Sequence, residues 1–356
     1  MTANEVANQV FEQLRGNGGA HDAGCYIAIP GDGAARWLLP ADGVNLGPVL
    51  ATWAPYRLRS RMAWAAVRAA SHIGQMSELP GTAPVEVDGA SAAQWESLGW
   101  RWCGTPAPVI YLGTPGLRRK AVVHLVDRET ARCRAVVKVP LTEEAKAAVR
   151  HEAEVLEALE AERYERAPRL LFVDWARSIS TQTFVEGRPG ARKLAAEHWR
   201  LLRSLLLAGE TTSLLAHAEG WQRCAGSAAW AVEELRDGSP LPACWEHADF
   251  TPWNIRRLKD GECALLDWEC ARRKGLPLMD AFHFLHMQDF LFGESPRRHG
   301  TRVWEEAARM GIPARWIRRL EIAYLVGAYV ECMRSGNDAR GRYVHATLER
   351  FRRKAE

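Results

Sequence analysis

The sequence predicts an α+β fold with two lobes: a small antiparallel sheet carrying one main helix, then a mostly helical lobe, with an extra region at the N-terminus. Three observations lead to this prediction. The 356 residues, 47% hydrophobic and 25% charged, have the length and composition of a globular protein of two or three domains. Short β-rich runs and one helical stretch fill residues 105–187. Helical spacing of apolar residues dominates after residue 190.

The first 104 residues are predicted to form an N-terminal accessory region. Apolar residues at helical spacing predict a short helix over 5–14, and an Ala-rich stretch predicts another over 59–73. Short apolar runs at 25–29 and 37–39, separated by Gly, Asp and Pro, predict strands. No motif in this region indicates a chemical role.

Residues 105–187 are predicted to form the small lobe. Thr142 followed by two glutamates suits the N-terminal cap and the positive dipole end of a helix that runs to about Glu162. Three strands are expected before this helix and two after it, and the break at Gly187–Gly190 ends the lobe. The predicted strands cover 109–113, 121–127, 135–139, 170–175 and 180–186.

Residues 188–356 are predicted to form the helical lobe. The stretch 247–269 interrupts the helical pattern. The predicted helices cover 198–207, 211–218, 228–236, 278–292, 302–310 and 314–333.

Charge and composition argue against several classes of partner. A net charge of +4 and a pI near 8.6, with scattered basic residues, are too weak to indicate nucleic acid. The densest basic run, at 350–354, is interpreted as a solvated helix end. No run of about 18 apolar residues predicts a membrane span, and the first 25 residues lack the apolar core of a signal peptide. The eight cysteines form no C-x-x-C pair, which favours free thiols and a cytoplasmic protein.

The stretch 247–269 carries the most distinctive chemistry, H-A-D-F-T-P-W-N followed by L-L-D-W-E. One carboxylate that orients a hydroxyl, with an amide and a second carboxylate that hold Mg²⁺ on a triphosphate, is the set that phosphoryl transfer needs. We therefore assign Asp249 as the candidate base and Asn254 and Asp267 as candidate metal ligands. His247 belongs to the same candidate catalytic loop, where a packed structural role is favoured over proton transfer. The alternative is that Asp249 and Asn254 only cap turns.

Lys138 and Glu152 are the candidate pair that binds the α- and β-phosphates. Lys138 lies within an apolar strand, A-V-V-K-V, where it would either bind phosphate or point to solvent. Glu152 falls on the apolar stripe of the helix that starts at Thr142. A carboxylate on a buried stripe is costly unless it is paired, and the strand just upstream supplies the cation. The alternative is a Glu at the edge of the stripe that reaches water.

The segment L-G-T-P-G-L-R is the candidate phosphate loop, with contacts expected from Gly113, Thr114 and Gly116. It is not a full G-x-G-x-x-G motif, and Pro115 removes one backbone donor. A tight hairpin explains the segment equally well.

These residues resemble the aminoglycoside phosphotransferase and choline kinase-like superfamily, which has a protein-kinase-like fold. D-F-T-P-W-N and D-W-E are typical of it, and the loop is similar to the kinase H-R-D-x-x-x-x-N motif with Ala248 in place of Arg. The resemblance covers about residues 105–350. It implies that Asp280, in P-L-M-D-A-F-H-F, is a structural acid that braces the catalytic loop. It also implies a hinge over 184–187, where Phe184, Val185 and Glu186 would receive the nucleotide base.

The resemblance predicts an Mg²⁺-dependent phosphotransferase that uses ATP or GTP and a hydroxyl of a small molecule as acceptor. A sugar, an aminoglycoside-like compound or an amino alcohol is the expected substrate class. A non-catalytic pseudokinase that binds nucleotide is the alternative, although none of its commonly lost residues is missing here. A protein kinase is disfavoured because only about ten residues separate Asp267 from Pro277, too few for a regulated activation segment. The acceptor, the choice of nucleotide, the oligomeric state and a role in antibiotic resistance stay open.

Overall fold

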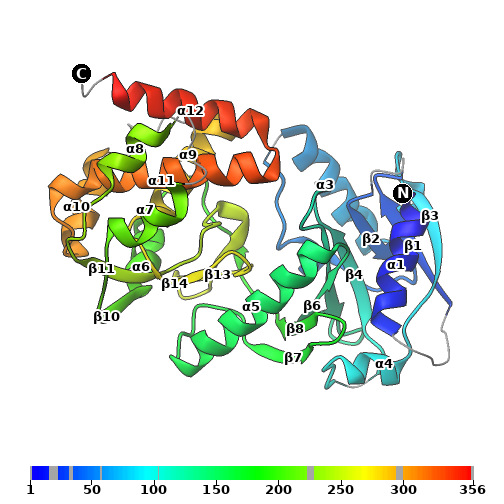
Figure 1. Ribbon diagram of the computed structural model, residues 1–356. Coiled ribbons are helices and arrows are strands. Elements are labelled where there is room, and N and C mark those ends of the chain that lie inside the picture. Colours follow the sequence, from blue (N-terminus) through cyan, green and yellow to red (C-terminus); the bar gives the residue numbers. More distant parts are fainter. Residues whose placement is uncertain are drawn as a thin grey trace. The chain divides into compact units, whose positions relative to one another are not determined.

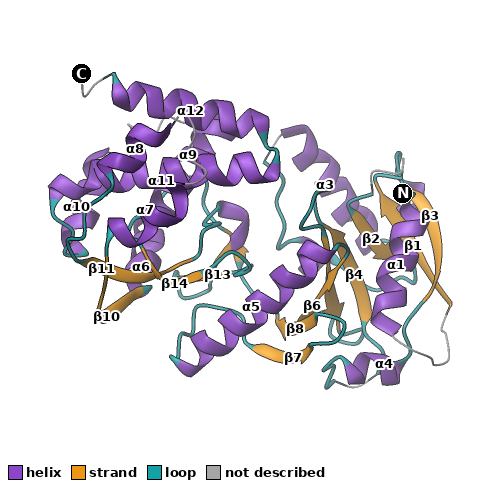
Figure 2. Cartoon of the chain, in the orientation of Figure 1, coloured by secondary structure: helices purple, strands orange, loops and turns teal. Residues whose placement is uncertain are grey.

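The computed structural model describes residues 2–15, 23–31, 35–56, 58–102, 104–222, 228–293 and 300–353. The chain divides into two compact units, Met1–Pro189 and Gly190–Glu356. The helices and strands are coloured by sequence in Figure 1 and by type in Figure 2.

One eight-stranded antiparallel sheet is the frame of the first unit. Its strand order is β3-β1-β2-β4-β5-β6-β8-β7. The strands are β1 (Ala23–Ile29), β2 (Trp37–Pro40), β3 (Ala83–Asp88), β4 (Ala107–Leu112), β5 (Lys120–Val126), β6 (Cys133–Pro140), β7 (Leu170–Asp174) and β8 (Ile179–Thr183). Strands from the first 104 residues therefore extend the sheet that the later strands form, because β2 pairs directly with β4.

The helices of the first unit pack on this sheet. They are α1 (Ala3–Arg15), α2 (Gly47–Leu50), α3 (Leu58–His72), η1 (Met76–Glu78), α4 (Ala92–Ser97) and α5 (Glu143–Ala161), and the short β9 (Arg188–Pro189) ends the unit. The side chain of Thr142 accepts a hydrogen bond from the backbone N–H of Ala145 at 3.1 Å, so it caps α5 as predicted. Helix α5 contacts β6, β7 and β8.

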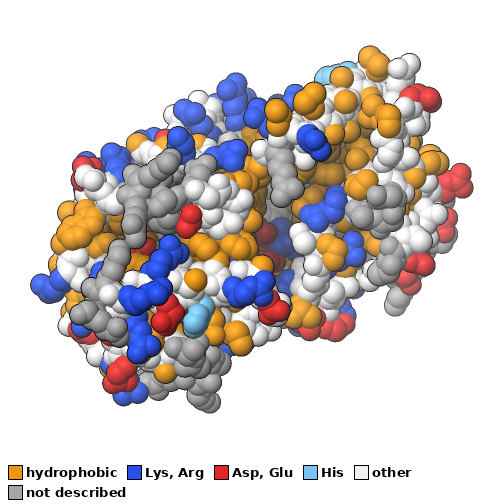
Figure 3. All heavy atoms as spheres, turned by 90° about the horizontal axis from the view of Figure 1, so that it is seen from above, with side chains coloured by type: hydrophobic (Ala, Val, Ile, Leu, Met, Phe, Trp, Pro, Cys, Tyr) orange, Lys and Arg blue, Asp and Glu red, His pale blue; other side chains and the backbone are white. Residues whose placement is uncertain are grey.

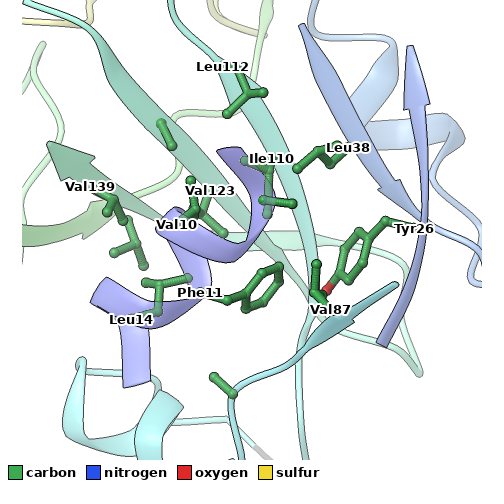
Figure 4. Packing of buried hydrophobic residues seen from close by; sticks show 14 of the residues in the cluster. Val10, Phe11, Leu14, Tyr26, Leu38, Val87, Ile110, Leu112, Val123 and Val139 are labelled. Carbon is green, nitrogen blue, oxygen red and sulfur yellow. The ribbon is translucent and has the colours of Figure 1, made fainter. Parts of the chain in front are cut away.

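The two faces of the sheet carry different cores because side chains alternate along each strand. On β2, Leu38 belongs to one buried cluster while Trp37 and Leu39 belong to the other. Helix α1 covers the first face, and Figure 4 shows its Phe11 and Leu14 directed toward the strands. Helices α2 and α3 cover part of the second face, around Trp37.

The second unit is mostly helical. Its helices are α6 (Ala196–Ser204), α7 (Leu214–Gln222), α8 (Ala229–Glu234), η3 (Pro252–Asn254), α9 (Met279–Phe292), α10 (Gly300–Arg309), α11 (Ala314–Ser335) and α12 (Asp338–Arg352). Its strands are β10 (Leu206–Thr212), β11 (Leu241–Glu246), β12 (Ile255–Arg257), β13 (Cys263–Leu265) and β14 (Arg272–Gly275). Helix α11 contacts α7, α8, α9, α10 and α12 and is the centre of the helical core. The sheet β10-β11-β14 and the hairpin β12–β13 flank the loop that carries Asp249.

The predicted fold class is confirmed: an antiparallel sheet with one main helix is followed by a mostly helical unit. The prediction was wrong at residues 206–212, which were assigned to the ends of two helices and form β10 instead. Gly209 adopts φ +73° there, which breaks a helix, and Thr211 and Thr212 pair with β11, about thirty residues away in sequence. Strands β3, β9, β11, β12, β13 and β14 were not predicted either.

The division into domains at 1–104, 105–187 and 188–356 stays a prediction. The structure places its own division between Pro189 and Gly190, and β1, β2 and β3 share the sheet of the predicted small lobe.

The described part of the chain contains no helix with both the length and the apolar composition needed to cross a membrane. Six cysteines lie within it as free thiols: Cys25, Cys133, Cys244, Cys263, Cys270 and Cys332. On the face drawn in Figure 3, Lys and Arg side chains are spread among hydrophobic and acidic ones.

Replacing Phe11 by alanine is expected to lower the free energy of unfolding by about 3–5 kcal/mol, because Phe11 is fully buried between α1 and the sheet. Urea denaturation measures this. Glu12→Ala, an exposed change on the same helix, is the matched control and should alter stability by less than about 0.5 kcal/mol. Equal effects of the two changes would contradict the packing of α1 on the sheet.

Candidate functional site

Lys138 and Glu152 form a buried ion pair in the first unit. The Lys138 Nζ lies 2.6 Å from Glu152 Oε1 and 2.5 Å from Oε2. Lys138 is 4% exposed and Glu152 is fully buried. The alternative of a solvent-facing Lys138 is thus wrong, and so is the alternative of a Glu152 that reaches water. The pair holds the ammonium in one position on the sheet.

Lys138 lies on the more open face of the sheet. Along β5 and β6, fully buried Val123, Ala135 and Val137 alternate with the half-buried Val122 and Val136. Val122 pairs with Lys138 across β5 and β6, and Tyr111 pairs with Val122 across β4 and β5, so these three side chains share one face. Helix α1 packs on the opposite face.

The predicted hinge lies at the end of the same face. Phe184 follows β8, and its backbone N–H donates to the carbonyl of Arg134 at 3.2 Å. Its ring meets the ring of His124 edge-on at 6.2 Å and packs on the second core of the sheet. Val185 is half-buried, and Glu186 forms an ion pair with Arg132 at 2.5 Å.

The segment 113–116 forms a tight turn between β4 and β5. The backbone N–H of Gly113 donates to the carbonyl of Lys120 at 2.9 Å, and a Cβ on Gly113 would lie 2.8 Å from that oxygen. Gly116 adopts φ +156°, and Thr114 is exposed at the tip. The close approach within the hairpin therefore explains the glycine at position 113 by itself. Thr114 is exposed and accessible to a ligand.

Asp280 anchors the candidate catalytic loop of the second unit. Its carboxylate accepts the backbone N–H of His247 and that of Ala248, each at 2.8 Å, from the first turn of α9. Burial raises the pKa of Asp280 to about 7, and the nearby Glu246 acts in the same direction, while the two N–H donors oppose the shift. Asp280 therefore contacts the candidate catalytic loop, as the resemblance implied.

Both ring nitrogens of His247 are engaged by the backbone. Nε2 lies 2.8 Å from the carbonyl oxygen of Leu266, and Nδ1 accepts the N–H of Asp249 at 3.3 Å. Burial lowers the pKa of His247, which favours the neutral ring with one donor and one acceptor. The imidazole thus positions the loop and is not free to carry a proton.

Asp249 is hydrogen-bonded by Asn254, lies close to His283 and remains partly open. Its Oδ2 accepts a hydrogen bond from Nδ2 of Asn254 at 2.8 Å, and its Oδ1 lies 3.3 Å from Nε2 of His283. Burial lowers the pKa of His283, which favours the neutral ring. The Asp249 side chain is 37% exposed, which makes it accessible to a substrate.

Asn254 and Asp267 lie at the open end of the β12–β13 hairpin. Asn254 precedes β12 and Asp267 follows β13, and the N–H of Leu266 donates to the carbonyl of Asn254 at 2.8 Å. Asp267 adopts φ +65°, a left-handed conformation that costs a non-glycine residue about 1–2 kcal/mol. Nδ2 of Asn254 donates to Asp249, so the side-chain carbonyl oxygen of Asn254 points elsewhere and is chemically suited to bind a cation.

An amide oxygen and a carboxylate are hard donors that fit Mg²⁺, which in proteins keeps waters and phosphate oxygens as its other ligands. The described residues contain no cluster of three or more His, Cys, Asp or Glu that would hold a metal by protein ligands alone.

Further polar residues of α9, α11 and α12 surround Asp249. Arg340 donates to the hydroxyl of Tyr324 at 3.3 Å, and its charge interacts with Asp249. His286 lies 2.9 Å from Glu321 Oε1.

Solved structures of small-molecule kinases match this chain. The choline kinase LicA from Streptococcus pneumoniae is 12% identical, with a TM-score of 0.45, and the match covers 65% of this chain and 88% of that one. A macrolide 2'-phosphotransferase type I is 16% identical, with a TM-score of 0.47 and coverage of 72% and 96%. The GDP and kanamycin complex of APH(2")-IIia is 12% identical, with a TM-score of 0.47 and coverage of 69% and 93%.

The chain is thus similar to choline kinase and aminoglycoside phosphotransferases. No protein-family model matches the chain, and no curated protein sequence does. At these identities the function proposed below rests on the chain's own residues.

Sequence reasoning missed His283, Tyr111 and Val136. His283 lies three residues after Asp280, the spacing that puts two side chains on one face of a helix, so the signal was present once Asp280 had been noticed. Tyr111 and Val136 follow from the alternation along β4 and β6, but only after the pairing of these strands is known.

Replacing Lys138 by methionine is expected to lower the free energy of unfolding by about 3–5 kcal/mol, because the buried Glu152 carboxylate would lose this cation. The double variant Lys138→Met/Glu152→Leu should recover most of the loss, since both charges are then removed. Urea denaturation of both variants measures the difference. A single variant as stable as the wild type would contradict the pairing.

The contribution of Asp280 to stability is expected to fall as pH rises. Its pKa in the folded protein is raised from 3.8 to about 7, so between these values the folded protein holds a proton that the unfolded chain releases. This contribution is therefore fully present below about pH 4 and is lost as pH rises through about 7. Denaturation at pH 4 to 8 should show the wild type losing stability relative to Asp280→Asn. A difference that is constant with pH, or that grows, would contradict the raised pKa.

Proposed function

We propose that this protein is a magnesium-dependent phosphotransferase that moves the γ-phosphate of ATP or GTP to a hydroxyl of a small molecule. A sugar, an aminoglycoside-like compound or an amino alcohol is the proposed acceptor class. The observation that carries the proposal is the Asp249 carboxylate, which accepts a hydrogen bond from Asn254 and lies close to His283, while over a third of its surface stays open.

Asp249 acts as the base in this proposal. As the acceptor oxygen forms a bond to the γ-phosphorus, Asp249 accepts the hydroxyl proton, and the bond to the β–γ bridging oxygen breaks to leave the nucleoside diphosphate. Asn254 orients one oxygen of Asp249, and His283 lies close to the other.

Lys138 neutralises the α- and β-phosphates, and Glu152 keeps its ammonium on the open face of the sheet. Backbone groups of Phe184, Val185 and Glu186 bind the adenine or guanine ring of the nucleotide. Gly113, Thr114 and Gly116 approach the phosphates. Asn254 and Asp267 would hold Mg²⁺, which when bound supplies positive charge for the phosphate oxygens. His247 and Asp280 position the loop without touching the substrate.

Replacing Asp249 by alanine is expected to reduce turnover by at least about a hundredfold while leaving nucleotide affinity within about threefold, because the base contributes to the chemical step. Coupled assays of nucleoside diphosphate release, with a panel of sugars, aminoglycosides and amino alcohols, measure turnover. Calorimetry with Mg²⁺ and nucleotide measures affinity.

The matched control is Asp338→Ala, an exposed carboxylate in the first turn of α12. It should leave both quantities unchanged. Turnover that survives in Asp249→Ala would show that Asp249 is not the base. A wild type that binds nucleotide but transfers phosphate to no acceptor in the panel would favour the non-catalytic alternative.

A further inference from the structure

Arg36, in the N-terminal region, is fixed at the turn that follows β4. Its backbone N–H donates to the carbonyl of Ile29 at 2.9 Å, and its carbonyl accepts the N–H of Leu112 at 2.8 Å. Its Nη2 donates to the hydroxyl of Tyr111 at 2.6 Å and to Thr114 Oγ1 at 3.2 Å. The guanidinium also lies 5.3 Å from the centre of the Tyr111 ring. Backbone and side chain together aim this cation at residues 113–116.

The positive charge of Arg36 has no carboxylate partner within the part of the chain that the structure describes. Its hydrogen-bond acceptors are the neutral hydroxyls of Tyr111 and Thr114, and its buried Nε has no hydrogen-bond partner there. By contrast, Arg128 pairs with Asp42 at 2.6 Å. A half-buried cation without a carboxylate partner is costly, and an anionic ligand at its accessible N–H groups would reduce this cost.

Arg36 and Lys138 lie on the same face of the sheet. Tyr111, over which Arg36 stacks, pairs with Val122, and Val122 pairs with Lys138. Tyr111 and Lys138 are therefore two strands apart, about 10 Å between backbones. One extended polyanion on this face can meet both cations.

We propose that Arg36 is a phosphate-binding residue of the nucleotide site, supplied by the N-terminal region to a turn in which Pro115 lacks an N–H donor. This inference rests on the proposed function. Pro115 has no N–H, so the turn offers fewer backbone donors than a glycine-rich loop, and the guanidinium of Arg36 supplies directed donors in their place. It binds the phosphates that the turn 113–116 covers.

Arg36→Gln is the test, with isothermal calorimetry of ATP against adenosine and of GTP against guanosine, in the presence of Mg²⁺. The variant is expected to lose about tenfold or more in affinity for the triphosphate, because a charge-assisted contact is removed. Its affinity for the nucleoside should stay within about twofold. Arg128→Gln, which removes an exposed arginine of the same unit, is the matched control and should change neither affinity.

Unchanged triphosphate affinity, or an equal loss for triphosphate and nucleoside, would overturn the role of Arg36 and leave the proposed function standing. A wild type that binds neither ATP nor GTP would overturn the proposed function itself. If Arg36→Gln fails to fold, Arg36→Lys keeps the charge but loses the forked donors. A smaller loss confined to the triphosphate is then expected, and an unchanged ratio of the two affinities would overturn the proposal.

Discussion

The carboxylate of Asp280 is the constraint on which the second unit's site depends. Ala248 adopts φ +62°, a conformation that costs a non-glycine residue about 1–2 kcal/mol. The N–H groups of His247 and Ala248 both donate to Asp280, and each bond is worth about 0.5–1.5 kcal/mol with a neutral acceptor and about 1.5–3 kcal/mol with a charged one. Together the two bonds offset the strain, so the loop keeps its turn. Helix α9 supplies both Asp280 and His283, so one rigid element sets both the loop and its carboxylate.

The two faces of the sheet in the first unit are covered by different helices. Helix α1 packs on one face, while α2 and α3 cover part of the other. Lys138, Val122 and Val136 are left on that other face, with Lys138 buried and the two valines half-buried. The N-terminal region is thus part of this architecture: its strand β2 lies against β4 and brings Arg36 to the turn.

The ion pair of Lys138 and Glu152 is expected to add little net stability to the fold, which favours a functional reason for its presence. Burying two charges costs several kcal/mol, and two apolar residues of similar size would often stabilise a core as well or better. Removing only one partner, however, is strongly unfavourable. A pair of this kind keeps an ammonium ready at a fixed position, which a phosphate-binding site needs and a core does not.

The sequence by itself determined the order of elements in the small lobe, the capped helix at Thr142, and the motif residues Asp249, Asn254 and Asp267. These follow from local patterns, in which alternation, helical spacing and turn residues are all read within a few positions. The pairing of Lys138 with Glu152 was also within reach, because a carboxylate on an apolar stripe demands a partner and only a short segment separates the two.

Only the tertiary structure decided that residues 1–104 share the sheet, that residues 206–212 form a strand, and that Arg36 meets Thr114. Each depends on pairing between segments far apart in the chain, such as β2 with β4 and β10 with β11. Local sequence contains no information on which distant strand will supply the hydrogen bonds, because the register is set by the buried faces of both partners together.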